Sequence, residues 1–375
     1  MFVKNTVMMR KILLLLLILF SFSQIHATHI MGGEITWRCI KDPASPNLGQ
    51  YVFTMKLYRD CEGLGTLSTV SYPISVWFHP TVTSITLNWV SNTDISPPCN
   101  SLNSGNLQLD CYGSTPAGAV EEYIYESQPI ALPGTPPANG WHFTWDSCCR
   151  NGAISNLVLS SVSSPSEGFT LRAAMFPYTD PVTGVPVPAD PCFDSSPVFN
   201  ESPKTIICAG YDFAYSHNAS DPELDSIRYY WAEPLDDFVG AYDPDPAMGS
   251  PAAIPFVPPY AFNAPLPGGP SLDPVSGEIS YSASVSQAGY YATVTRVDAY
   301  KCGQKIAEIH RDIQAVLIAC SSMPGTVAQP NDPPVVPTPV GAQTWTTVSG
   351  SSLLASYETT VTAGTFVTFN ITGLD

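Results

Sequence analysis

The sequence predicts an all-β protein made of tandem β-sandwich domains stapled by disulfides. Short runs such as "YVFTMKLYR" at residues 51–59 alternate apolar and polar residues, the period-two pattern of a half-buried strand. The chain also has 37 prolines and 26 glycines between these runs. Because proline costs about 3 kcal/mol in a helix interior, no long helix is expected. A β-barrel is the alternative arrangement of the same strands.

The first 27 residues predict a secretory signal peptide. Lys4, Arg10 and Lys11 precede the apolar run "ILLLLLILF" at residues 12–20, and Ala27 offers a small residue for cleavage. A membrane-spanning helix needs about 20 apolar residues, which this run does not reach. We therefore expect an extracellular or outer-cell-surface protein with no transmembrane segment in its mature part.

Composition predicts the domain boundaries. Residues 28–200 contain seven cysteines and predict a Cys-rich β-sandwich domain. Residues 201–320, from "ESPKTIIC" to "RDIQAVLIAC", have the size of one immunoglobulin-like sandwich. The closely spaced prolines of residues 321–345 predict an extended linker. Residues 346–375 alternate like strands and predict the truncated start of a further β-domain.

Charge narrows the classes of partner. The chain carries 15 Lys and Arg against 32 Asp and Glu, a formal net charge of −17 at pH 7. This charge repels nucleic acid and anionic membrane surfaces, so neither is an expected partner. Divalent cations are compatible with it.

The 10 cysteines predict disulfides rather than a metal centre, because the chain is exported and contains no Cys-x-x-Cys pair. The candidates are Cys39, Cys61, Cys99, Cys111, Cys148, Cys149, Cys192, Cys208, Cys302 and Cys320. The pairings that we expect are Cys99 with Cys111, Cys208 with Cys320, and Cys39 and Cys61 with the adjacent Cys148 and Cys149.

Five stretches together resemble a known family: "THIMGGEITWRC", "YVFTMKLYRDC", "SCCRNGAISNL", residues 195–235 and residues 272–320. The motifs "YRDC", "CCRN" and "RDIQ" occur in them in this order. They are similar to the N-terminal region of large secreted surface proteins of Bacteroidetes, the gliding-motility-associated or PKD-domain-containing proteins. The resemblance covers residues 28–320. It implies an adhesin-like protein, exported by the type IX pathway, with repeated immunoglobulin-, PKD- or cadherin-like modules and a C-terminal sorting domain.

A possible calcium site is predicted in "ASDPELDS" at residues 219–226, where Asp221, Glu223 and Asp225 alternate. Calcium takes six to eight oxygen ligands, and alternate carboxylates on an irregular loop can direct several of them at one centre. The alternative is a simple turn that Asp221-Pro222 initiates, with the charges in solvent. The resembling family has Asp-Pro-Asp-Gly-Asp-Ser here, so this chain departs from the pattern at Glu223 and Leu224.

Other polar residues are expected to be surface groups. His142 alternates with two aromatic residues and predicts an outward side chain, and "HRD" at residues 310–312 predicts a strand surface. The acidic residues Glu121, Glu122 and Glu126 are expected to be surface charge rather than a glycosidase pair. Most tryptophans are expected in the core, since aromatic residues favour buried strands.

No nucleophile elbow, zinc-protease motif or phosphate loop occurs, so we expect a protein that is not an enzyme. The predicted function is a secreted or cell-surface adhesin-like structural protein that binds a glycan or protein ligand and, through the resemblance, is associated with gliding motility. The alternative is a carbohydrate-binding accessory region of a secreted hydrolase.

Overall fold

The computed structural model describes residues 30–370 apart from residues 62, 64–65, 97–110, 113–118, 162–166, 204–205, 210–212, 239, 246–248, 282–286, 320–339, 342–345, 352–353 and 359–368. Within these residues the secondary structure is strands, bridges and turns without helix, so the all-β prediction is confirmed. It follows that no described helix is long and apolar enough to cross a membrane. The predicted signal peptide lies outside the described residues, as do residues 321–339 and 342–345 of the predicted linker.

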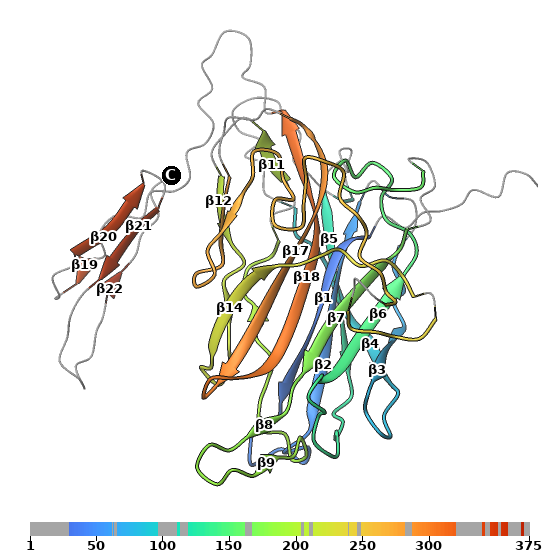
Figure 1. The fold of residues 1–375 in the computed structure, drawn as a ribbon, viewed down its shortest axis with the longest axis vertical. Coiled ribbons are helices and arrows are strands. Elements are labelled where there is room, and N and C mark those ends of the chain that lie inside the picture. The colour runs from blue at the N-terminus through green and yellow to red at the C-terminus, as the bar shows by residue number, and fades with distance from the viewer. Residues whose placement is uncertain are drawn as a thin grey trace, which may run out of the picture.

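Eleven described strands form the main sheet (Figure 1). They are β1 (Ile30–Cys39), β2 (Tyr51–Asp60), β3 (Ser71–Trp77), β4 (Ser84–Asp94), β5 (Val120–Ser127), β6 (Trp141–Ser147), β7 (Phe169–Met175), β11 (Ile206–Ala209), β14 (Ser226–Trp231), β17 (Gly289–Lys301) and β18 (Gln304–Ala319). Their order is β1-β2-β5-β4-β3-β6-β7-β18-β17-β14, with β11 beside β18.

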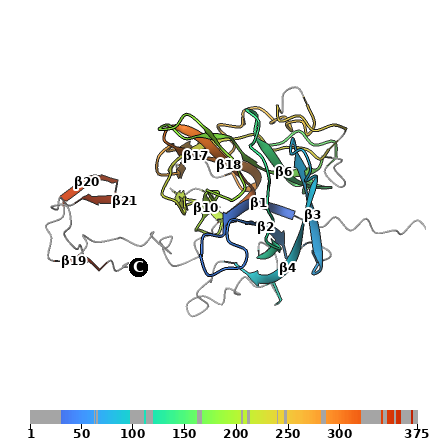
Figure 2. The ribbon, with the colours of Figure 1, turned by 90° about the horizontal axis from the view of Figure 1, so that it is seen from below.

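Strand β18 closes this sheet into a ring. One of its edges pairs with β17 over its length, and the other edge is shared by three strands. Residues 307–309 pair with β7, residues 311–313 pair with β1, and residues 316–319 pair with β11. Figure 2 shows the sheet curling from β1 and β2 through β4 and β3 to β6. The sheet therefore runs without interruption across the predicted boundary at residue 200.

Two consecutive glycines let β1 fit between its neighbours. A Cβ atom on Gly32 would overlap the carbonyl oxygen of Asp312 on β18. One on Gly33 would lie 2.5 Å from the carbonyl oxygen of Lys56 on β2. Only glycine permits backbones to approach so closely, which explains why "GG" occurs inside a strand.

The remaining described strands are short and form separate small sheets. They are β8 (Tyr178–Thr179) with β9 (Pro186–Val187), β10 (Val198–Phe199) with β13 (Ala219–Ser220), β12 (Phe213–Ser216) and β15 (Ser271–Leu272) with β16 (Glu278–Tyr281), β19 (Val340–Gly341) with β22 (Phe369–Asn370), and β20 (Thr346–Ser351) with β21 (Leu354–Glu358). The small sheets of β8–β9, β10–β13 and β12-β16-β15 are each formed by segments between β7 and β17.

The main apolar core lies inside the ring. Trp37, Phe53 and Phe143 meet with ring centroids 4.6–6.2 Å apart. The same cluster includes Val297 and Ile309, which come from β17 and β18. One core is therefore built by strands from both sides of residue 200.

The described disulfides correct the predicted pairings. Cys39 bonds to Cys192, Cys61 bonds to Cys111, and the adjacent Cys148 and Cys149 bond to each other. The expectation that Cys148 and Cys149 reach separate partners is therefore wrong, as is the pairing of Cys99 with Cys111. Spacing could not reveal this, because the fold brings Cys39 to a residue 153 positions away.

Cys302 is an exposed free thiol, so its inclusion among the disulfide candidates is also wrong. The predicted bond between Cys208 and Cys320 falls on side chains outside the described residues, as does Cys99.

Candidate cation site

The acidic stretch at residues 221–225 forms a tight turn that leads into β14. Oδ1 of Asp221 accepts hydrogen bonds from the backbone N–H groups of Glu223 at 2.9 Å and Asp225 at 3.1 Å. Leu224 has a φ of 63° and is 91% exposed at the tip. An aspartate that accepts bonds from amides ahead of it stabilises such a turn. The predicted turn is therefore present. Whether the turn can also bind a cation depends on where its carboxylates lie.

The turn places two of its three predicted ligands beside a third carboxylate that lies elsewhere in the sequence. Oxygen atoms of Asp194, Asp221 and Glu223 all lie within 4.8 Å of one another. Asp194 and Asp221 are buried, and Glu223 is half-buried. Asp194 follows Cys192, whose disulfide to Cys39 fixes this segment against the end of β1. Sequence reasoning missed Asp194 because its proximity arises from the fold.

Two lysines face the same carboxylates. Nζ of Lys301, at the end of β17, lies 2.9 Å from Asp194 and also pairs with Asp225. Nζ of Lys41 lies 2.6 Å from Glu223. The predicted ligand Asp225 therefore faces Lys301 and is not one of the three clustered carboxylates.

Burial makes this concentration of negative charge costly. It raises the pKa of Asp194 to about 8, although Lys301 acts in the opposite direction, and the charges of Glu223 and Asp221 raise the pKa further. Burial likewise raises the pKa of Asp221. Oδ2 of Asp221 is buried and accepts no hydrogen bond from a described residue. Either a proton or a cation would relieve the repulsion between these groups.

The three carboxylates fit a calcium ion in spacing and charge. Calcium–oxygen distances of about 2.3–2.6 Å place oxygens on opposite sides of the ion about 5 Å apart, which matches the spacing here. With all four acidic groups ionised, Lys41 and Lys301 leave a net charge of two negative units. Asp194, Asp221 and Glu223 are thus the residues that would hold a divalent cation.

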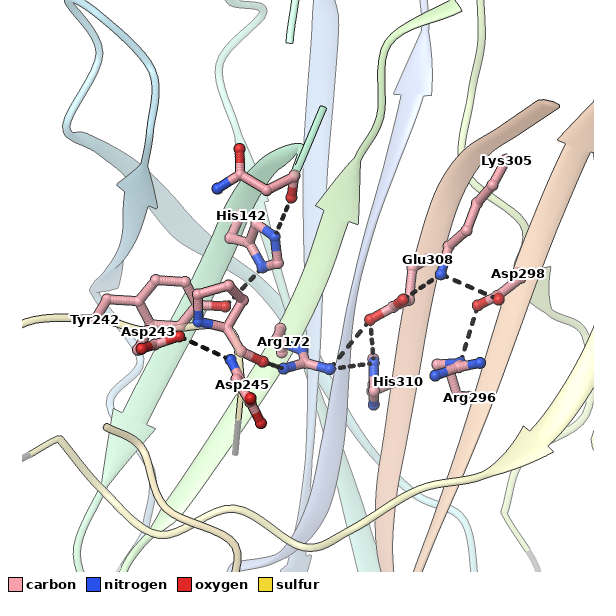
Figure 3. A network of polar contacts seen from close by, with 12 residues as sticks. His142, Arg172, Tyr242, Asp243, Asp245, Arg296, Asp298, Lys305, Glu308 and His310 are labelled. Carbon is pink, nitrogen blue, oxygen red and sulfur yellow. Dashed lines mark hydrogen bonds and ion pairs between the residues drawn. The ribbon is translucent and has the colours of Figure 1, made fainter. Parts of the chain in front are cut away.

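A second group of charged residues lies along β7, β17 and β18, with Asp298, Glu308 and His310 buried and Arg172, Arg296 and Lys305 partly buried (Figure 3). Nη2 of Arg172 lies 3.2 Å from Oε1 of Glu308 and 3.3 Å from Nε2 of His310. The same Oε1 lies 2.7 Å from His310, and Lys305 joins Glu308 to Asp298. Burial and the Arg172 charge lower the pKa of His310 to about 4, so it is neutral at pH 7.

This network also holds the loop after β14. Nη1 of Arg172 donates to the carbonyl oxygen of Pro244 at 2.9 Å, and the Tyr242 hydroxyl lies 2.6 Å from Nδ1 of His142 (Figure 3). Burial lowers the pKa of His142 to about 4. The expectation that His142 points outward is wrong, because Tyr242 in the segment after β14 covers this face. The side chains of Arg172, Glu308, His310, His142 and Tyr242 all bond to other residues of the chain. The network therefore joins β6, β7 and β18 to the loop after β14.

The "HRD" residues are buried rather than on a strand surface, which corrects the prediction. Arg311 pairs with Glu34 on β1, and its guanidinium lies 4.1 Å from the Phe199 ring centre. Asp312 accepts bonds from Arg150 at 2.6 and 3.3 Å. Residues of "THIMGGEITWRC", "CCRN" and "RDIQ", which all belong to stretches that carried the resemblance, therefore meet at β18.

Glu121 and Glu122 were expected to be surface charge, and the structure shows otherwise. Glu121 is 2% exposed and lies 3.1 Å from Arg59 of "YRDC", and Glu122 is 9% exposed. Among the tryptophans, Trp37, Trp141 and Trp145 are buried as expected, whereas Trp89 is 37% exposed.

Comparison with protein-family models, with curated proteins and with solved structures finds no match to this chain. The resemblance to gliding-motility-associated surface proteins therefore stays a prediction.

Proposed function

We propose that this chain is a non-catalytic, adhesin-like structural protein that is exported and works outside the cell or on its outer surface. The observation that carries the proposal is the pair of disulfides that tie distant segments to the main sheet, Cys39–Cys192 and Cys61–Cys111. Such bonds persist in oxidising compartments and are rare in the cytosol. They support export together with the predicted signal peptide.

The buried charges support a structural role. Arg150, Arg311 and Arg172 each pair with an acidic residue that β18 or β1 supplies. Charges used in this way fix strands against one another and are not available to a substrate. The proposed mechanism is mechanical: a stiff, covalently tied sheet displays a binding surface away from the cell.

The cation site adds a second tie to this proposal. A divalent ion held by Asp194, Asp221 and Glu223 would join the segment after Cys192 to the turn before β14. Because the ion binds the folded chain, it would stabilise that chain by mass action.

Surface exposure and adhesion test the proposal directly. In intact cells that produce an epitope-tagged chain, added protease should remove the tag signal, and deletion of the gene should reduce attachment of cells to a coated surface. Restoring the gene should restore attachment. A tag that resists protease until the cells are lysed, or a deletion without effect on attachment, would contradict the proposal. Gliding speed of the same strains tests the association that the resemblance implies.

A second candidate is the carbohydrate-binding accessory region of a secreted hydrolase. It is favoured by a partly exposed aromatic cluster in which Trp77 stacks on Tyr242 at 5.1 Å, beside Phe238 and the 42% exposed Phe78. Aromatic faces of this kind stack on sugar rings. A catalytic domain in the downstream coding sequence would favour this candidate, and a series of further β-modules would favour the adhesin.

A further inference from the structure

A polar hollow lies at one end of β1, β2 and β5, where the 40–50 loop meets residues 126–129. Its volume is about 460 Å³, within the range of roughly 300–1,000 Å³ typical of small-molecule sites. Arg38 and Glu126 alternate along their strands with the core residues Trp37 and Tyr125. The hollow is therefore on the face of the sheet opposite the apolar core.

The walls of the hollow are held rigidly. Ile40 N–H donates to the Gln50 carbonyl at 2.9 Å, and Gly49 N–H donates back to the Ile40 carbonyl at 2.9 Å. Cys192, which is disulfide-bonded to Cys39, donates its N–H to the Gly49 carbonyl at 2.7 Å. Tyr51 and Ile130 exchange two backbone hydrogen bonds at 2.8 Å. Binding of a ligand here would therefore lose little conformational entropy in ordering the site.

The lining combines planar polar groups with three apolar residues. Five lining residues carry planar guanidinium, carboxylate or amide groups: Arg38, Asp42, Asn47, Glu126 and Gln128. Ile40, Val52 and Pro129 contribute apolar surface between them. No hydrogen bond or ion pair joins the Arg38 guanidinium to another described residue, and the side chain is exposed. Its five donors are thus directed to solvent or a ligand.

We propose that this hollow binds a neutral saccharide. Planar carboxylate, amide and guanidinium groups each offer two atoms to adjacent hydroxyls, and the apolar lining residues suit the C–H groups of a sugar ring. Asp42 and Glu126 together outweigh Arg38, so an acidic sugar is disfavoured. This inference rests on the proposed adhesive function and names the class of its ligand.

Isothermal titration calorimetry with cellotetraose, maltotetraose and chitotetraose tests the inference on the purified protein. At least one of these neutral oligosaccharides should bind. Arg38→Ala and Glu126→Ala should each weaken binding by about tenfold or more, because each removes charge-assisted hydrogen bonds to ligand hydroxyls. Both side chains are solvent-accessible, so the melting temperature should stay near that of the wild type.

Two control variants locate the site. Lys56→Ala changes a charge on the same face outside the hollow, and Phe78→Ala removes the exposed ring of the aromatic cluster; both should bind like the wild type. The inference is overturned if none of the three oligosaccharides binds at millimolar concentration, if tetragalacturonate binds better, or if Phe78→Ala abolishes binding while the hollow variants retain it. If the wild-type protein binds none of the oligosaccharides while gene-dependent cell attachment is intact, the saccharide site is refuted and the adhesin proposal stands.

Discussion

The apolar core inside the ring and the charged seam along β18 hold the same sheet together in different ways. In the core, Trp37, Phe53 and Phe143 pack as tilted rings, an attraction with little directional requirement. Along the seam, Glu308, Arg311 and Asp312 each contact a charged partner from a different segment. Apolar burial thus supplies driving force, and we infer that the seam specifies which segments meet β18.

The largest expected effect comes from removing one partner of a buried ion pair in the seam. Asp312→Ala leaves the buried Arg150 guanidinium without its carboxylate, and should reduce the free energy of unfolding by about 3–5 kcal/mol. The double variant Arg150→Met/Asp312→Leu should recover most of that loss, because no unpaired charge remains. Urea unfolding followed by tryptophan fluorescence measures both.

A pair with more solvent access provides the comparison for this experiment. Lys56 lies 3.4 Å from Glu122, and their side chains are 29% and 11% exposed against 4% for both Arg150 and Asp312, so Lys56→Ala should cost clearly less than Asp312→Ala. If Asp312→Ala costs no more than Lys56→Ala, the seam does not fix the sheet.

Backbone contact at the seam gives the next largest effect. Gly32→Ala places a methyl group against the carbonyl oxygen of Asp312, so β1 must move away from β18, at a cost of about 3 kcal/mol. Gly184 has a φ of 70° but nothing near its would-be Cβ, so Gly184→Ala should cost only about 1 kcal/mol. Thermal melting of the two variants compares them, and equal melting temperatures would mean that β1 and β18 are not closely joined.

The difference between the apolar core and the charged seam also explains which features could be predicted from the sequence. Alternation in "YVFTMKLYR" correctly marked β2, because side-chain period depends on local backbone geometry. The same alternation pattern placed His142 and residues 310–312 on the surface, which is wrong. The pattern assigns polar residues of a strand to solvent, and it fails where both faces of the sheet are covered by other parts of the protein. In this chain Tyr242 covers His142, and Glu34, Phe199 and Arg150 contact Arg311 or Asp312.

The candidate cation site was predictable only in its local part. The turn follows from Asp221-Pro222 and needs no tertiary information. Asp194 lies near Asp221 because the chain between the two residues folds back on itself. Lys301 forms an ion pair with Asp225 because the β17–β18 hairpin ends beside the turn. Pairing of Cys39 with Cys192 is of the same kind, since it depends on topology.

Acid should weaken the loop attachments at the seam. The pKa of His142 lies near 4 in the folded chain, below the usual 6.5, because burial disfavours the charged ring. The stability that this neutral histidine contributes is present above pH 6.5 and is lost as pH falls towards 4, about 2 kcal/mol of it at pH 5. Melting temperatures between pH 7 and 5 measure the loss, and His142→Gln should reduce the slope, while the buried His310 and His217, whose pKa values are also lowered, keep the remainder. An unchanged slope in that variant would show that His142 does not titrate in this range.

The cation site and the charged seam respond to pH with opposite signs, and calcium binding at the cation site has the smallest effect that we expect. The pKa of Asp194 is raised to about 8, so the folded chain holds a proton that the unfolded chain releases near pH 4. Stability from this group is therefore lost as pH rises from about 4 through 8. Calcium should compensate at pH 8.5. At ten times its dissociation constant it adds about 1.4 kcal/mol, or a few degrees in melting temperature.

Asp194→Asn and Asp221→Asn should each abolish this calcium-dependent rise, since each removes a clustered carboxylate. Asp180→Asn is the matched control, because Asp180 also accepts backbone N–H bonds in a turn, at 2.8 and 2.9 Å, but lies outside the cluster. A rise that persists in Asp221→Asn, or no rise at millimolar calcium, would mean that a proton alone relieves the repulsion. The carboxylates would then serve the turn and the two lysines, and the tie between Cys192 and β14 would be covalent and electrostatic without an ion.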